Sequence, residues 1–169
     1  MSAPPCHSTS LLIGKLSEAT AEVFETMVFR SIEGGGVVIV DEPVSEEVTA
    51  VNGTVKIVGS VGFAGSCSGV VVFHSSLSAA REITGAMLGL APEEVNGEVP
   101  DAIGEITNMI AGSFRTKMTT EGDAWAISVP TVTVGSDFSI KSLCHRHRAV
   151  LPFRMGGSRL VVELIVPAA

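Results

Sequence analysis

A run of residues without a single Asp, Glu, Lys or Arg, from Ile57 to Ala80, limits the folds open to this chain. With about 24 residues, the run is nominally long enough for a helix to span a bilayer. Glycine and serine recur throughout it, whereas a membrane-spanning helix is far more apolar at its centre. We therefore expect two buried strands around a Gly-rich turn, and no association with a membrane.

The overall composition excludes two further classes of protein. Charged residues make up 17% of the chain, against roughly 25% in an average soluble domain, and hydrophobic residues make up 46%. Such a chain is too apolar to be intrinsically disordered. The formal net charge is −7 and the basic residues form no large patch, so binding to nucleic acid is not expected either.

The N-terminus and the cysteines indicate a cytoplasmic protein. The first ten residues lack the basic segment and the apolar core of a secretory signal peptide. Cys6, Cys67 and Cys144 are odd in number and widely spaced, as expected of reduced thiols rather than of a disulfide framework. For a chain of 169 residues we expect a flexible segment over residues 1–10 and a single domain over residues 11–169.

Hydrophobic periodicity predicts helices and strands in separate runs. An apolar stripe from Leu12 to Met27 indicates a first helix, which the glycines at 34–36 are expected to end. A second helix is expected over residues 77–88, with Ser75 or Ser76 as its N-cap and Gly89 at its end, and a third over residues 100–119, with Pro100 as its first residue. Residues 46–58 are expected to form a strand or a hairpin, and residues 138–153 a strand in one or two pieces. Further strands are expected over 37–40, 70–73, 125–134 and 160–166. Such segregated runs predict an α+β domain with a largely antiparallel β-sheet and helices packed on one face.

The third predicted helix carries the most specific pattern. Its core-facing stripe consists of isoleucines and Phe114, and the opposite face carries Asp101, Glu105, Asn108 and Gly112 in a row. A glycine costs about 1 kcal/mol relative to alanine inside a helix. Glycines at 104 and 112 therefore suggest that something approaches the helix backbone closely. From the residues alone, an ordinary polar face and a docking or catalytic ridge both remain open.

The first predicted helix repeats this spacing. Glu18, Glu22 and Glu25 follow the same four-then-three steps as Asp101, Glu105 and Asn108. The repeat suggests that the first and third helices carry related polar ridges, with Glu25 of the first at the position that Asn108 occupies in the third. An ordinary acidic helix face is the simpler interpretation for the first helix.

At this point the sequence resembles a known family. The pattern Asp101-x-x-x-Glu105-x-x-Asn108, followed about twenty residues later by Pro130, is similar to the signature of the CheC/CheX/FliY chemotaxis phosphatases. The resemblance covers roughly residues 11–166 and is best to the CheX branch. Members of the CheC type carry two active helices, so Glu25 in the first helix implies a single active ridge, as in CheX. The resemblance implies a CheC/CheX-like fold.

The resemblance also implies a function. Members of this family hydrolyse the aspartyl phosphate of a phosphorylated CheY-type response regulator, which itself supplies Mg²⁺ and a lysine. By analogy the chain is a protein phosphatase with no cofactor of its own, in which Asn108 orients the attacking water and Glu105 pairs with the lysine. Asp101 would add docking contacts, and Gly112 would leave room for the partner.

The resemblance has a further implication for assembly, and two alternatives to the phosphatase remain open. CheX-like proteins pair through sheet edges, so a homodimer is expected. One alternative is a non-catalytic CheX-like module that binds a response regulator or a component of the flagellar switch. Another is an unrelated α+β domain whose ridge is ordinary surface.

The segment from Cys144 to Arg148 carries residue types that bind metal ions. On a strand, His145 and His147 share one face while Cys144 lies on the other. Two histidines without a third ligand make a weak site, so no metal is expected. The segment is instead expected to be an exposed or edge strand that carries basic residues.

Overall fold

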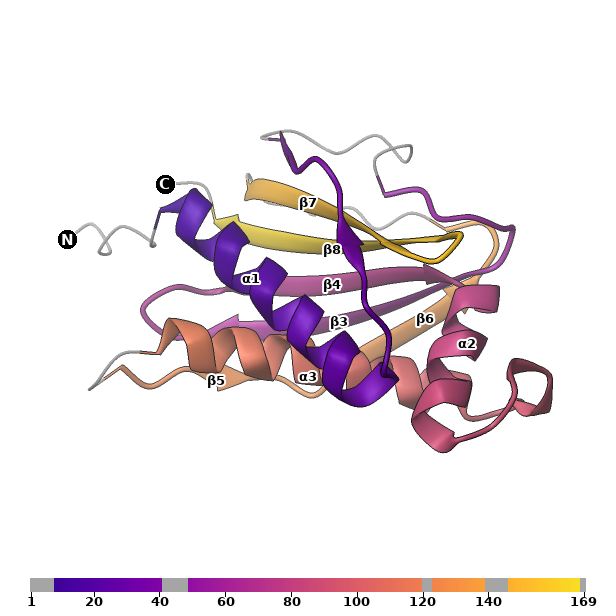
Figure 1. Cartoon of the computed structure of the whole chain (residues 1–169). Coiled ribbons are helices and arrows are strands. Elements are labelled where there is room, and N and C mark those ends of the chain that lie inside the picture. Colours follow the sequence, from indigo (N-terminus) through magenta and orange to yellow (C-terminus); the bar gives the residue numbers. More distant parts are fainter. Residues whose placement is uncertain (1–7, 41–48, 120–122, 139–145, 168–169) are drawn as a thin grey trace.

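The computed structural model describes residues 8–40, 49–119, 123–138 and 146–167, and these form one antiparallel sheet with helices (Figure 1). In the described residues the sheet has eight strands in the order β1-β7-β8-β4-β3-β5, with β2 beside β7 and β6 beside β3. The strands are β1 Glu33–Gly34, β2 Val38–Val40, β3 Lys56–Ala64, β4 Gly69–Ser76, β5 Ala126–Ile127, β6 Thr131–Gly135, β7 Arg146–Met155 and β8 Ser158–Pro167.

The run without charged residues forms the central hairpin of this sheet. Strands β3 and β4 pair antiparallel along their length, from Lys56 opposite Ser76 to Phe63 opposite Gly69. The expected pair of buried strands is confirmed. No helix in the described part of the chain is both long and apolar enough to cross a membrane.

Three α-helices accompany the sheet in the part of the chain that the structure describes. They are α1 Thr9–Val23, α2 Leu77–Leu88 and α3 Val99–Met118, with a π-helical turn η1 Phe24–Val28 and a 3₁₀ turn η2 Pro92–Glu94. The Ser76 side chain caps α2 by accepting from the backbone N–H of Ala79, and Gly89 ends it with φ +70°. Pro100 stands in the first turn of α3, where its missing N–H breaks no helical hydrogen bond.

The first helix ends earlier than expected. It stops after η1, because Phe29 adopts the left-handed conformation with φ +55°. The glycines at 34–36 therefore do not terminate it, and Gly34 lies in β1. The predicted strand or hairpin over 46–58 is also corrected: β3 begins only at Lys56, and residues 41–48 lie outside the described residues.

The helices share one face of the sheet, as expected for this α+β fold. In Figure 1, α1 crosses the strands diagonally, and α3 lies below it beside β3 and β5. Alternate residues of β3, β4, β7 and β8 join buried residues of the three helices in one continuous core. On the other face a smaller apolar cluster contains Val58, Val72 and Ile165.

One expectation about the cysteines is wrong. Cys67, in the turn between β3 and β4, is disulfide-bonded rather than reduced. Cys6 and Cys144 lie outside the described residues. Spacing along the chain could not decide this point, because a disulfide depends on which Cα atoms the fold brings within about 7 Å.

Candidate functional site

The position of α3 is set by two glycines that let it lie close to the sheet. At Gly59 of β3, an added Cβ would meet the hydroxyl oxygen of Thr107, which is fully buried in the middle of α3. At Gly104 of α3, an added Cβ would lie 3.3 Å from the Val132 side chain and 3.7 Å from that of Pro130. The close approach inferred for Gly104 is thus made by the protein's own β5–β6 segment, and not by a partner.

The outward face of α3 carries the predicted site residues. Asp101 and Glu105 are exposed, Asn108 and Gly112 are half-buried, and the isoleucines and Phe114 are buried on the opposite side. We call these four outward residues the α3 ridge. Because residues three or four apart are neighbours on a helix surface, the ridge is a continuous line of side chains. An added Cβ at Gly112 would touch only the Ile127 side chain, at 4.0 Å.

The polar groups of the ridge are free to meet a partner. Within the described part of the chain, the side chains of Asp101, Glu105 and Asn108 form no hydrogen bond or ion pair. A carboxamide can both donate and accept a hydrogen bond, whereas an ionised carboxylate only accepts. The ridge therefore offers two negative charges beside one neutral group that can bind a water molecule.

The shape of the ridge favours a macromolecular partner. A cavity of about 630 Å³ opens at the N-terminal end of α2, between Arg30, Arg81 and Pro92. No residue of the α3 ridge lines this cavity. Small-molecule sites are concave and enclose their ligands. A convex helix face with projecting side chains is better suited to contact a protein surface.

Helix α1 braces α3 beside the ridge. The Glu22 carboxylate lies 2.6 Å from the Lys117 ammonium and accepts a hydrogen bond from the Ser113 hydroxyl at 3.3 Å. The bond from Lys117 lowers the pKa of Glu22 below its ordinary value of 4.5, and the same bond raises the pKa of Lys117 above 10.5. The middle member of the Glu18, Glu22 and Glu25 series thus joins two helices.

This ion pair makes a small part of the stability depend on pH. Because the folded-state pKa of Glu22 is lowered, its contribution is present above pH 4.5 and is lost as pH falls through the folded value. We expect Glu22→Gln to lower the free energy of unfolding slightly at pH 7 and not at pH 3, as measured by urea titration. An equal effect at both pH values would contradict this assignment, and 1 M salt should weaken the effect at pH 7.

The β5–β6 connection stands beside the first half of α3. The backbone N–H of Ser128 donates to the carbonyl of Gly62 at 2.8 Å, and the Gly62 N–H donates to the Ser128 hydroxyl at 2.9 Å. These bonds fix the turn that carries Val129 and Pro130. The proline of the family signature is therefore close to the α3 ridge in space, packed near Gly104.

A buried charged cluster lies on the opposite face of the sheet. Glu163 of β8 is fully buried, 2.6 Å from His74 Nε2 and 3.0 Å from Arg148 Nη2. A buried carboxylate needs such partners because its desolvation is costly. The expectation of an exposed or edge strand is wrong for Arg148, since β7 lies between β8 and the pair β1 and β2. Cys144 and His145 lie outside the described residues.

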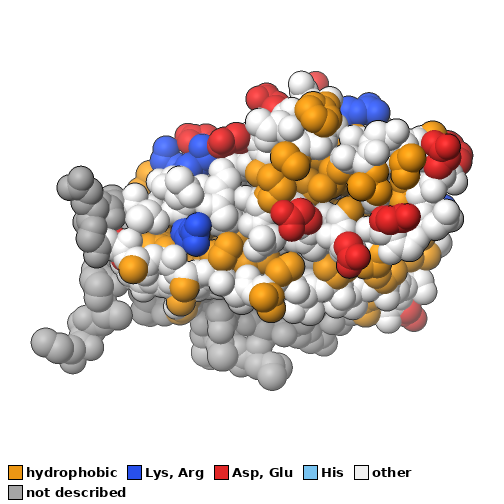
Figure 2. Space-filling model, turned by 90° about the horizontal axis from the view of Figure 1, so that it is seen from below, with side chains coloured by type: hydrophobic (Ala, Val, Ile, Leu, Met, Phe, Trp, Pro, Cys, Tyr) orange, Lys and Arg blue, Asp and Glu red, His pale blue; other side chains and the backbone are white. Residues whose placement is uncertain are grey.

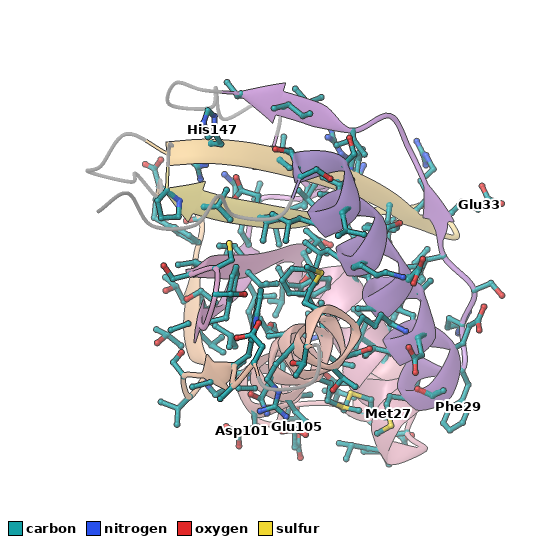
Figure 3. The ribbon with its side chains drawn as sticks, turned by 90° about the vertical axis from the view of Figure 1, so that its left-hand side faces the viewer. Met27, Phe29, Glu33, Asp101, Glu105 and His147 are labelled. Carbon is teal, nitrogen blue, oxygen red and sulfur yellow. The ribbon has the colours of Figure 1, made fainter. Side chains whose placement is uncertain are left out.

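Among the described residues, no group of three or more His, Cys, Asp or Glu side chains is arranged to hold a metal ion. His147, which lies at the edge of the molecule in Figure 3, is half-buried on β7.

Comparisons with known proteins agree with this geometry. The sequence matches the family described as chemotaxis phosphatase CheX over residues 57–154. It is 32% identical over 88 residues to the CheY-P phosphatase CheX of Thermotoga maritima, an alignment that covers 52% of this chain and 57% of that protein. The chain thus spans little more than half the length of this relative.

Solved structures share the fold at lower sequence identity. A CheC-like superfamily protein from a Shewanella species superposes with a TM-score of 0.79 at 21% identity, over 95% of this chain and 100% of that one. The CheX–CheY–BeF₃–Mg²⁺ complex from Borrelia burgdorferi contains a chain that matches with a TM-score of 0.69 at 18% identity, over 93% of this chain and 98% of that one. The antiparallel sheet with three α-helices is therefore a CheC/CheX-like fold.

Proposed function

Since the chain belongs to the CheX family of chemotaxis phosphatases, we propose that it accelerates hydrolysis of the aspartyl phosphate of a CheY-type response regulator. The observation that carries this proposal is the α3 ridge, where Glu105 and Asn108 project without partners in the described part of the chain. The name of the Thermotoga maritima relative supports the reaction, and the Borrelia burgdorferi complex supports the partner.

Asn108 would orient the water that attacks the phosphoryl group. Phosphoryl transfer passes through a loose transition state, so catalysis consists mainly of positioning and of charge stabilisation. The carboxamide oxygen can accept a hydrogen bond from the water, and its NH₂ group can donate a second bond nearby. A neutral side chain does this without adding negative charge beside the phosphate. Half-burial of Asn108 limits its rotamers and so favours one water position.

Glu105 and Asp101 would hold the regulator in register. Glu105 lies one helical turn before Asn108, at a distance suited to an ion pair with a lysine of the regulator while Asn108 faces the phosphoryl group. Asp101 would add a second charged contact, and Gly112 would let the partner lie close to the helix. The Mg²⁺ ion would belong to the regulator, as part of the substrate.

A direct assay tests this function. We expect that mixing the protein with a phosphorylated CheY-type regulator and Mg²⁺ accelerates the release of inorganic phosphate well beyond the regulator's own rate. A panel of such regulators is needed, because the ridge does not specify which one is recognised. Binding without any acceleration would instead identify a non-catalytic docking module. If the protein bound none of the regulators, the result would indicate that the α3 ridge is ordinary solvent-exposed surface.

We further propose that the chain forms a homodimer through its β2 edge. Strand β2 pairs on one side with β7 and exposes apolar side chains, of which Ile39 is 58% exposed. An apolar edge strand is prone to pair with another strand. We expect sedimentation of the protein to show a dimer and Ile39→Lys to show a monomer with unchanged circular dichroism. A dimeric Ile39→Lys variant would place the interface elsewhere.

A further inference from the structure

Phe29 ends the first helix in a conformation that is unfavourable for phenylalanine. The π-helical turn η1 closes when the backbone N–H of Phe29 donates to the Phe24 carbonyl, and Phe29 itself has φ +55°. Helices that end in this left-handed conformation usually have Gly or Asn there, because a Cβ atom is strained. Among the described residues, Phe29 is the one non-glycine residue with a positive φ.

The same side chain is also unusually exposed. Phe29 is 75% accessible to solvent, although a phenylalanine gains most when it is buried. The fold therefore carries strain at a residue whose ring contributes little to the core. Residues held in rare backbone conformations cluster at functional sites, and π-helical turns often mark such sites. Together, the strain and the exposure indicate a role for the ring outside the fold.

Phe29 lies on the same edge of the molecule as Asp101 and Glu105, the two acids of the α3 ridge. In Figure 3, Met27 and Phe29 follow Asp101 and Glu105 along the lower edge. Figure 2 shows this face from below, with apolar side chains lying between acidic ones. The bonds that Glu22 accepts from Lys117 and Ser113 join α1 to α3 just before η1 begins, so the end of α1 that leads to Phe29 is held against α3.

We propose that Phe29 is an apolar anchor for the response regulator that docks on the α3 ridge. This inference rests on the proposed function, and it extends the contact surface from α3 to the end of the first helix. The ring would enter an apolar depression on the regulator while Asp101 and Glu105 meet basic side chains. Buried aromatic anchors next to charged contacts are typical of binding hot spots.

Charge favours a regulator over a second copy of this chain at this surface. Glu25, on the turn that carries Phe29, is exposed, as are the two acids of the ridge. A second copy would also carry a net charge of −7 and would present like charges at the contact. A partner with basic groups around an apolar depression is the complementary surface.

The substitution Phe29→Gly separates binding from folding. Glycine adopts the left-handed conformation without strain, so the melting temperature is expected to stay the same or rise. For a CheY-type regulator activated with BeF₃ and Mg²⁺, titration calorimetry is expected to show a roughly tenfold higher Kd, the loss typical of a moderate hot spot. In steady-state assays KM should rise while kcat is unchanged, because the ring does not reach the reacting atoms.

Leu11→Ala is the matched control, since Leu11 is an exposed apolar residue at the opposite end of the first helix, 42% accessible. Its Kd is expected to equal that of the wild type. If Phe29→Gly bound the regulator with wild-type affinity, the role of Phe29 as an anchor would be overturned, whereas the proposed function would stand. Absence of regulator binding by the wild type would overturn both. If the wild type were a dimer and Phe29→Gly a monomer, the assignment of the partner would be overturned, because a second copy of the chain would then occupy this surface.

Discussion

Asn108→Ala is expected to abolish most of the acceleration of regulator dephosphorylation, lowering kcat by roughly a hundredfold or more, the range found when one positioned hydrogen-bonding group is removed from an active site. The reason is that the variant loses the carboxamide that holds the attacking water, and no neighbouring polar group of the ridge is neutral. The measurement is the release of inorganic phosphate from phosphorylated regulator under single-turnover conditions.

Folding and docking should survive this substitution. Asn108 forms no side-chain hydrogen bond in the described part of the chain, and alanine favours the helix more than asparagine does. We expect an unchanged or higher melting temperature and a Kd for BeF₃-activated regulator close to that of the wild type. If the variant lost binding together with catalysis, the result would indicate that Asn108 docks the regulator and does not position the water.

Two further substitutions on α3 sharpen the assignment. Asn108→Asp keeps the shape of the side chain but adds a negative charge beside the phosphoryl group and removes both amide donors. It should be as inactive as Asn108→Ala. Thr116→Ala serves as the control, because Thr116 is exposed two turns further along the helix, and its hydroxyl donates to the Gly112 carbonyl and to no other group among the described residues. It should keep the wild-type rate.

Local signals in the sequence were sufficient for the elements that carry the ridge. In the structure, Ser76 caps the start of α2 and Gly89 caps its end, and Pro100 stands in the first turn of α3. The helical period then separates the buried isoleucines of α3 from its outward acids. These predictions succeeded because caps, proline and periodicity act within one or two turns of the chain.

Features that depend on distant residues could not be predicted in this way. The bond between Glu22 and Lys117 joins positions far apart in the sequence, and neither residue carries a local sign of its partner. The glycines at 34–36 predict a later end for the first helix because glycine is the usual terminator, whereas in the structure Phe29 itself takes the left-handed conformation. The sequence does contain a sign of the buried charged cluster. Glu163 stands alone among apolar residues of its strand, and a carboxylate there needs partners from neighbouring strands.

A large loss of stability is also expected when the packing contact between Gly59 of β3 and Thr107 of α3 is disturbed. Gly59→Ala would place a methyl group against the Thr107 hydroxyl and 3.0 Å from its Cβ. Thr107 has little freedom to yield, because it is fully buried, β-branched and donates from its hydroxyl to the Ile103 carbonyl at 2.7 Å. The helix must therefore move away from β3. We expect a loss of about 2–4 kcal/mol in the free energy of unfolding, measured by urea titration.

The same shift should impair catalysis in the molecules that remain folded, because Asn108 directly follows Thr107. Gly62→Ala is the control in the same strand, since its added Cβ would meet the Ser128 hydroxyl at an ordinary 3.6 Å, and it should cost less than about 1 kcal/mol. Adding Thr107→Ala to Gly59→Ala removes the hydroxyl that makes the closest clash and leaves only the Cβ at 3.0 Å. The double variant should therefore be more stable than the sum of the two single losses of stability predicts. Strict additivity, or a Gly59→Ala protein as stable as the wild type, would show that this contact does not fix the helix. Partial recovery of stability together with kcat would instead show that the position of α3 on β3 controls the reaction through the placement of Asn108.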